Sequence, residues 1–191
     1  MLKVLKENLS FLSLLVVLIG TSSTESYYAS FGLKYQLLNV PATHILFRGL
    51  TAIWALPVLA ILYILALAIV TSQSRIALLL GGLDRLRWAN HGAVAIFVVL
   101  AWAGGEYAGY SAAMADMKAD ASGLPLVSKI DFKEGASDQM PSSPSQGYRL
   151  LLQTSEGLRI FKAVENPANE SPLIKFIPAG SINAVTICAR C

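Results

Sequence analysis

The stretch that decides the expected fold is GLTAIWALPVLAILYILALAIV, from Gly49 to Val70. It contains 22 consecutive residues without a charge, and a helix needs about 20 apolar residues to cross the hydrocarbon core of a bilayer. Two further uncharged runs flank it, Leu9 to Ser23 and Gly92 to Gly105. The three runs predict an α-helical membrane protein with three transmembrane helices. The expected spans cover about residues 8–29, 49–72 and 89–113.

Composition favours the same fold class and divides the chain in two. Charged residues make up 14% of the sequence, against about 25% in a typical soluble domain, and the mean hydropathy is +0.55. Most of the charged residues follow residue 115. We therefore expect a membrane domain over residues 1–118 and a small β domain over residues 119–191. The net charge of +3 is too small and too scattered to favour nucleic acid as a partner.

The first run has two interpretations. Lys3 and Lys6 ahead of an apolar run are typical of a signal peptide. However, the residues after Gly20 are Thr, Ser and Ser, and these do not form an A-x-A-like cleavage site. In a retained helix, such hydroxyl groups bond back to the preceding turn. We favour the retained helix and leave cleavage open.

Residues 27–40 follow the first span and carry aromatic side chains at helical spacing. Tyr27, Phe31 and Tyr35 recur every four residues, so a helix would place them on one face. Aromatic rings with a polar tip favour the membrane interface. We expect an interfacial, partly helical segment; the alternative is an ordinary loop packed on the domain.

The distribution of Lys and Arg predicts an orientation. With three spans, the N-terminus and the connection between the second and third spans lie on one side, and they carry one more Lys or Arg than the opposite side. By the positive-inside rule, the N-terminus is cytoplasmic and the C-terminal domain periplasmic or extracellular. The expected location is the bacterial inner membrane.

The third span carries small residues at regular spacing. Ala101, Gly105, Gly109 and Ala113 recur every four residues, which predicts a ridge that lets another backbone approach closely. Glu106 lies beside this ridge and is a candidate intramembrane ionisable site. The alternative for Glu106 is a position near the end of the span, within reach of water.

The C-terminal part alternates apolar and polar residues, as half-buried strands do. YRLLLQT and LRIFKAV predict one hairpin, and PLIKFIP and INAVTIC predict a second pair. LPLVSKIDF, residues 124–132, is a candidate earlier strand, and residues 135–147 read as a Ser/Pro-rich loop. The segment FIPAGSINAVTI resembles the turn between the last two strands of SH3-like barrels. The expected domain is a small antiparallel sheet, with an SH3-like half-barrel as the candidate form.

The chain ends in a C-x-x-C pair, Cys188 and Cys191. This spacing occurs in thiol redox proteins and in half of a zinc site. The two histidines lie far away in the sequence, and a zinc site needs two further ligands. We therefore expect no metal, no cofactor and no catalytic residues here, and regard the pair as a candidate disulfide.

One segment resembles a known group of proteins. YYASFGLKYQLLNVPATHILFRGL, residues 27–50, is similar to the YYxxFG-type segments of uncharacterised bacterial inner-membrane proteins. This resemblance implies no particular activity.

The sequence favours a structural or interaction protein whose β domain binds a partner. The alternatives are a subunit of an oligomeric channel or transporter, and a membrane-bound redox protein or enzyme. The expected partners are the lipid bilayer and, through the third span or the β domain, a second copy or another protein.

Overall fold

The computed structural model describes residues 2–55, 57–58, 61, 83–118, 123–133, 137–139 and 147–188. Contacts within the chain divide it into two units. The helical unit consists of Met1–Tyr27 and Pro41–Tyr110, and the β unit consists of Tyr28–Val40 and Ser111–Cys191. This division differs from the expected boundary at residue 118, because Tyr28–Val40 belongs to the unit that holds the sheet.

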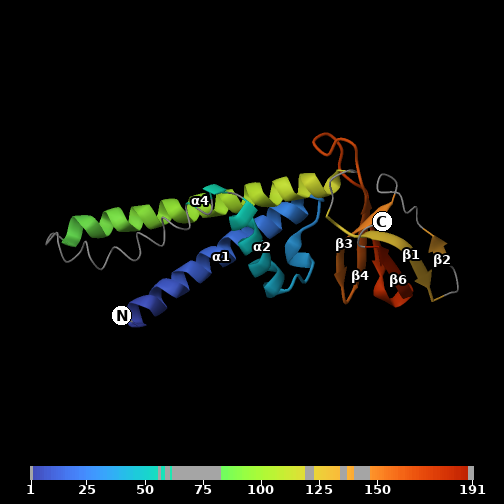
Figure 1. The fold of residues 1–191 in the computed structure, drawn as a ribbon, viewed down its shortest axis with the longest axis horizontal. Helices are drawn as coiled ribbons and strands as arrows, with labels where there is room; N and C mark the ends of the chain where they lie inside the picture. Colours follow the sequence, from blue (N-terminus) through green and yellow to red (C-terminus); the bar gives the residue numbers. More distant parts are fainter. Residues whose placement is uncertain are drawn as a thin grey trace. The chain divides into compact units, whose positions relative to one another are not determined.

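Three helices supply the described part of the helical unit (Figure 1). They are α1 (Leu2–Ser30), α2 (Ala42–Ala55) and α4 (Leu83–Met117). The hydroxyl side chains of α1 bond back to the preceding turn, as expected: Thr24 Oγ1 donates to the carbonyl of Gly20 at 2.6 Å, and Thr21 Oγ1 donates to that of Val17 at 2.8 Å. These bonds satisfy polar groups that would otherwise compete with the helix.

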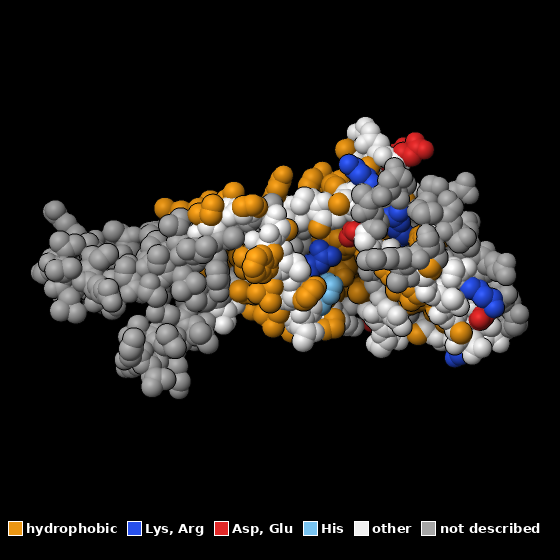
Figure 2. Space-filling view, viewed as in Figure 1, with side chains coloured by type: hydrophobic (Ala, Val, Ile, Leu, Met, Phe, Trp, Pro, Cys, Tyr) orange, Lys and Arg blue, Asp and Glu red, His pale blue; other side chains and the backbone are white. Residues whose placement is uncertain are grey.

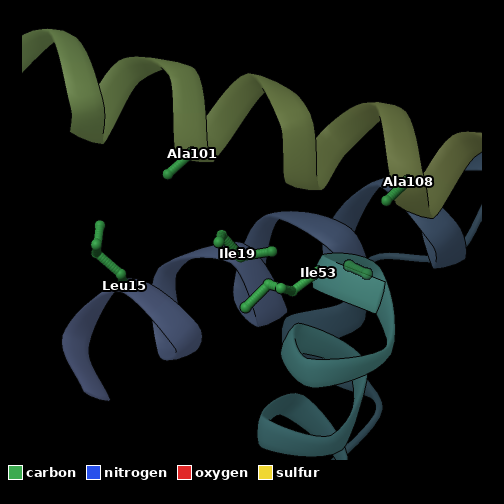
Figure 3. Close-up of a cluster of buried hydrophobic side chains, with 6 residues drawn as sticks. Leu15, Ile19, Ile53, Ala101 and Ala108 are labelled. Atoms are coloured by element: carbon green, nitrogen blue, oxygen red, sulfur yellow. The ribbon is translucent and has the colours of Figure 1, made fainter. Parts of the chain in front are cut away.

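The core of the helical unit is built from small and branched side chains. Figure 3 shows this cluster, in which all three helices take part. Its members are Leu15, Ile19, Ala52, Ile53, Ala101 and Ala108. Because half of these side chains are alanines, the helices pack with their backbones close together.

Glycines mark the points where the helices come closest. A Cβ atom on Gly49 of α2 would collide with the carbonyl oxygen of Val16 in α1. On α4, a Cβ on Gly105 would collide with Ser22 Oγ, and one on Gly109 with the carbonyl oxygen of Ser23. Any larger residue at these positions would force the helices apart.

The structure corrects the expected fold class. Within the described ranges, no helix combines the length and the apolar character needed to cross a membrane. The prediction of a membrane protein with three transmembrane helices is therefore wrong. The predicted inner-membrane location, with a cytoplasmic N-terminus and an external C-terminal domain, depended on those helices and is contradicted with them.

The sequences of the helices bear on this difference. In α1 the apolar part is followed by four consecutive hydroxyl residues, 21–24, and α2 is described over Ala42–Ala55. In α4 the uncharged run Gly92 to Gly105 is short and rich in Ala and Gly, which add little apolar surface. Most of the expected second span, 49–72, lies outside the described residues, of which positions 57, 58 and 61 are the last in that stretch.

The β unit holds an antiparallel sheet. Its strands are β1 (Leu126–Phe132), β2 (Ser137–Gln139), β3 (Tyr148–Thr154), β4 (Gly157–Lys162), β5 (Ile174–Pro178) and β6 (Ile182–Cys188). The order of the strands is β2-β1-β3-β4-β5. β1 also pairs with β6, which lies off this path, on the edge of β1 away from β3. Strands are present at each of the five segments predicted from alternation, and β2 lies inside the predicted loop 135–147. The segment expected to form an SH3-like turn covers the end of β5, the 3-10 turn η2 (Ala179–Ser181) and most of β6.

One face of the sheet encloses an apolar core. Val127, Ile130, Leu158 and Ile160 are buried at its centre. Partly buried side chains from β1, β3, β5 and β6 surround them. In β4 the inward Leu158 and Ile160 alternate with Arg159 and Phe161 on the other face, as the period of a strand requires.

Two segments from elsewhere in the sequence pack in the β unit. Phe31, in the segment Tyr28–Val40, makes an edge-to-face contact with Phe161 of β4, with ring centroids 4.9 Å apart. Both rings are buried. Phe31 thus packs on the sheet of its own unit, while the interfacial segment expected over residues 27–40 stays a prediction.

The second segment is the C-terminal end of α4. Arg149 of β3 is only 3% exposed, and its Nη1 donates to the carbonyl oxygens of Asp116 at 3.0 Å and Lys118 at 2.7 Å. These carbonyls lack a partner within the helix. A cation at this end also interacts favourably with the helix dipole. Arg149 thus attaches the helix end to the sheet.

Candidate binding surface of the β unit

A hollow of about 160 Å³ opens at one end of the sheet. Its walls come from the β3–β4 hairpin (Gln153, Thr154, Gly157, Leu158), from η2 (Ala179) and from β6 (Ile182, Val185). Leu158 belongs to the core cluster, and Ile182 and Val185 pack against it. The hollow is therefore a place where the apolar core of the β unit reaches the surface.

The tight β3–β4 turn gives the hollow a fixed wall. Thr154 pairs with Gly157, so two residues form the loop. Gly157 has a positive φ of 154°, and a Cβ atom there would collide with the carbonyl oxygen of Ile177. Glycine is therefore required where the hairpin meets β5.

Glu156 connects this turn to two neighbouring segments. Its backbone carbonyl accepts a hydrogen bond from the N–H of Ala179 at 2.8 Å. Its side chain accepts one from Asn39 Nδ2 at 3.2 Å. Asn39 has a positive φ of 48°, a conformation that Asn tolerates better than most residues. The turn, η2 and the segment Tyr28–Val40 are thus held together around one residue.

A second surface feature lies on the face of β4 and β5 opposite the core. Arg159 and Phe176 are cross-strand partners, and the Arg159 guanidinium lies over the Phe176 ring, 4.9 Å from its centroid. Arg159 Nη1 is buried and has no hydrogen-bond partner in the part of the chain that the structure describes. Phe176 is 49% exposed. A stacked guanidinium of this kind is suited to bind a carboxylate or phosphate.

Sequence alone indicates part of this arrangement. The alternation in GLRIFK predicts that Arg159 faces away from Leu158 and Ile160. It does not predict that Arg159 meets Phe176, because that contact depends on the register between β4 and β5. The hollow has no local sequence signal, since three separate elements form it.

The predicted ridge of small residues lies on α4. Ala101, Gly105, Gly109 and Ala113 are all buried. In the helical unit, Gly105 and Gly109 lie against Ser22 and Ser23 of α1. The ridge positions within the helical unit thus contact the chain's own first helix.

Glu106 is exposed on α4. Its Oε1 accepts a hydrogen bond from Trp102 Nε1, one helical turn earlier, at 2.9 Å. The interpretation of Glu106 as an intramembrane ionisable site stays a prediction.

Cys188 is the last residue of β6. Cys188 is disulfide-bonded, and Cys191 lies outside the described residues. The pairing of Cys188 with Cys191 therefore stays a prediction.

In the described part of the helical unit, His44 and Arg48 lie close to the Tyr27 ring or to one another. The Arg48 guanidinium lies 3.5 Å from the centroid of the buried Tyr27 ring. His44 precedes Arg48 by one helical turn. Burial, and secondarily the positive charge of Arg48, lower the pKa of His44 from its ordinary value of 6.5. We therefore expect His44 to be neutral at pH 7.

Large apolar side chains are exposed on the helical unit, and Figure 2 shows them gathered on its surface. On and after α2 these side chains are Phe47, Leu50, Trp54, Val58 and Ile61. Trp54 is 87% exposed. Exposed apolar surface of this extent is typical of a site where another molecule binds.

Chemical motifs and comparisons add no further site. Among the described residues, no group of three or more His, Cys, Asp or Glu side chains is placed to hold a metal ion. No protein-family model, curated protein or solved structure matches the chain. The resemblance of residues 27–50 to inner-membrane proteins therefore stays an expectation, and the geometry alone supports a function.

Proposed function

We propose that this chain is an interaction protein whose β unit binds a segment of another protein in the hollow beside η2. The observation that carries this proposal is the opening of the apolar core between the β3–β4 hairpin, η2 and β6. A cavity of about 150 Å³ is large enough for a benzene-sized group. The hollow therefore has the size of one apolar or aromatic side chain.

The chemistry of the walls supports binding of such a side chain. Leu158, Ile182 and Val185 supply apolar contacts, while Gln153 and Thr154 offer polar groups. One apolar anchor in a pocket with a polar rim is the usual centre of a protein–protein contact. The short turn and the bonds of Glu156 hold the walls in place before a partner arrives, which reduces the entropy lost on binding.

The proposal is tested by crosslinking in the producing cell. The full chain carries the photoreactive residue benzoylphenylalanine at Gln153, on the wall of the hollow. After irradiation we expect a discrete adduct with another protein. Filling the hollow with Ala179→Phe should remove this adduct, because the new ring occupies the space of the anchor.

The matched control places the same photoreactive residue at Lys129, on β1 and outside the lining of the hollow. It should not yield the same adduct. Absence of any adduct at Gln153, or an adduct that persists in the Ala179→Phe variant, would show that the hollow is not the binding site.

A further inference from the structure

The free edge of β5 carries a second inference, which concerns the kind of partner and rests on the proposed function. In the described part of the chain, β5 has one strand neighbour, β4, and so ends the sheet. An edge strand presents unpaired N–H and C=O groups that another chain can pair with. Addition of an extended peptide to such an edge is a common mode of peptide recognition.

The hydrogen-bond pattern identifies which groups of β5 point outward. The N–H of Ala179 donates to the carbonyl of Glu156, and the carbonyl oxygen of Ile177 lies against Gly157 of β4. Along an antiparallel strand, residues whose backbone groups bond to the neighbouring strand alternate with residues whose groups point away from it. Counting back from Ala179 in steps of two, Ile177 and Lys175 therefore bond to β4. The N–H and C=O groups of Ile174 and Phe176 then point to the free edge.

Pro178 limits the length of this edge. It would be the next outward position, but proline has no N–H to donate. The edge thus offers two outward donors, at Ile174 and Phe176, and would pair with a segment of about five residues, the length of β5.

The charges on the two strands select the partner. β4 and β5 together carry Arg159, Lys162 and Lys175, and neither strand contains Asp or Glu. A second copy of this chain, adding its own β5, would bring these cations toward one another, and like charges across strands are destabilising. An acidic segment would instead meet opposite charge.

Arg159 is placed to recognise a carboxylate in that segment. Its guanidinium lies over Phe176 and so already reaches from β4 across to β5. The next strand would lie about 4.8 Å beyond β5, with the residue opposite Phe176 on the same face as the guanidinium. Since Arg159 is partly exposed, a carboxylate there would meet the guanidinium where it stacks on Phe176.

We propose that the outer edge of β5 binds an extended acidic segment of a partner protein, with a Glu or Asp opposite Phe176 paired to Arg159. Main-chain hydrogen bonds to Ile174 and Phe176 align the partner segment with β5. The Arg159 charge supplies the preference for acidic over basic sequences.

The test measures peptide binding to the full chain by fluorescence anisotropy. The probe is a fluorescein-labelled peptide, Thr-Val-Glu-Val-Glu-Val-Glu-Thr, and its counterpart has Lys in place of every Glu. We expect saturable binding of the acidic peptide only. Arg159→Gln should weaken it at least about tenfold, since a hydrogen bond to a charged group is lost.

A second variant, Ile174→Pro, removes one outward N–H at the first residue of the strand, where proline is tolerated. It should also weaken binding about tenfold or more. The matched control is Lys133→Gln, which removes an exposed cation next to β1 and should leave binding unchanged. Circular dichroism melting establishes that each variant folds. If Arg159→Gln does not fold, Arg159→Lys replaces it. We then expect weaker binding of the acidic peptide, because the planar guanidinium group is lost.

The proposal is overturned if the acidic peptide does not bind, if the Lys peptide binds equally well, or if either edge variant binds like the wild type. These outcomes leave the crosslink from Gln153 untouched. A failed edge with an intact crosslink therefore rejects this inference alone, whereas loss of the crosslink rejects the proposed function.

Discussion

Replacing Arg149 with Met should release the end of α4 from the sheet. The change keeps a long apolar side chain but removes both hydrogen bonds to the carbonyls of Asp116 and Lys118, at 3.0 and 2.7 Å. Leaving each of the two part-buried acceptors without its donor costs about 1–3 kcal/mol, and loss of a cation at a helix C-terminus costs about 0.3–1 kcal/mol. The relief of burying a charge offsets part of this cost. We expect a net loss of about 2–4 kcal/mol in the stability of the β unit.

Hydrogen–deuterium exchange of the full chain measures this loss locally. Every 1.4 kcal/mol is a factor of ten, so protection of amides in residues 112–118 and in β3 should fall roughly 30-fold to 700-fold. The matched control is Arg159→Met, the same change on the neighbouring strand, where the guanidinium stacks on a half-exposed ring. It should cost less than about 1 kcal/mol, the usual range for an exposed cation–π contact. Equal protection in the wild type and the Arg149→Met variant would refute the role assigned to Arg149.

Three further predictions concern packing and pH. Gly105→Val should destabilise the helical unit by about 3 kcal/mol, because the new side chain collides with Ser22; Ala103→Val, on the exposed side of α4, is the control in a thermal melt. The pKa of His44 is lower in the folded chain than its ordinary 6.5, so the unfolded chain binds the proton more readily. Stability should fall as the pH drops below about 6.5, and a His44→Gln variant followed by urea unfolding should lose this dependence. Phe31→Ala should cost about 3–5 kcal/mol and make residues 28–40 sensitive to protease, whereas unchanged cleavage would argue against the contact with the sheet.

The strands were predictable because their signal is local. YRLLLQT and GLRIFK both form strands, β3 and β4, although the polar Arg149 is buried in β3 and Phe161 is buried together with Leu158 and Ile160 in β4. The turn was predictable from Gly157, which the close approach to β5 requires. The short strand β2 was missed because its residues, Ser-Asp-Gln, have low strand propensity.

The membrane prediction failed because a run of uncharged residues does not show whether a helix lies in lipid or packs against other helices of the chain. Ala101 and Gly105 count as uncharged residues in a span, yet in the structure they let α4 lie close to other helices of the same unit. The ridge spacing was visible in the sequence, but the partner helix was not, because Ser22 is more than 80 residues away.

The candidate site was beyond sequence reasoning for a related reason. Arg159 reads as an ordinary exposed position of a strand. Its role depends on Phe176, which is its neighbour only through the register of β4 and β5. Likewise Arg149 occupies a strand position but bonds to carbonyls at the end of α4, 33 and 31 residues earlier.

The contact of Phe31 with Phe161 also affects the order in which parts of the chain can fold during synthesis. The ribosome makes Phe31 some 130 residues before its partner ring, and β1 must wait for β6, the last strand, before both its edges are paired. Contacts this distant in sequence slow folding. The aromatic segment therefore emerges during translation with its surface uncovered, and the β unit can close only after β6 has been made.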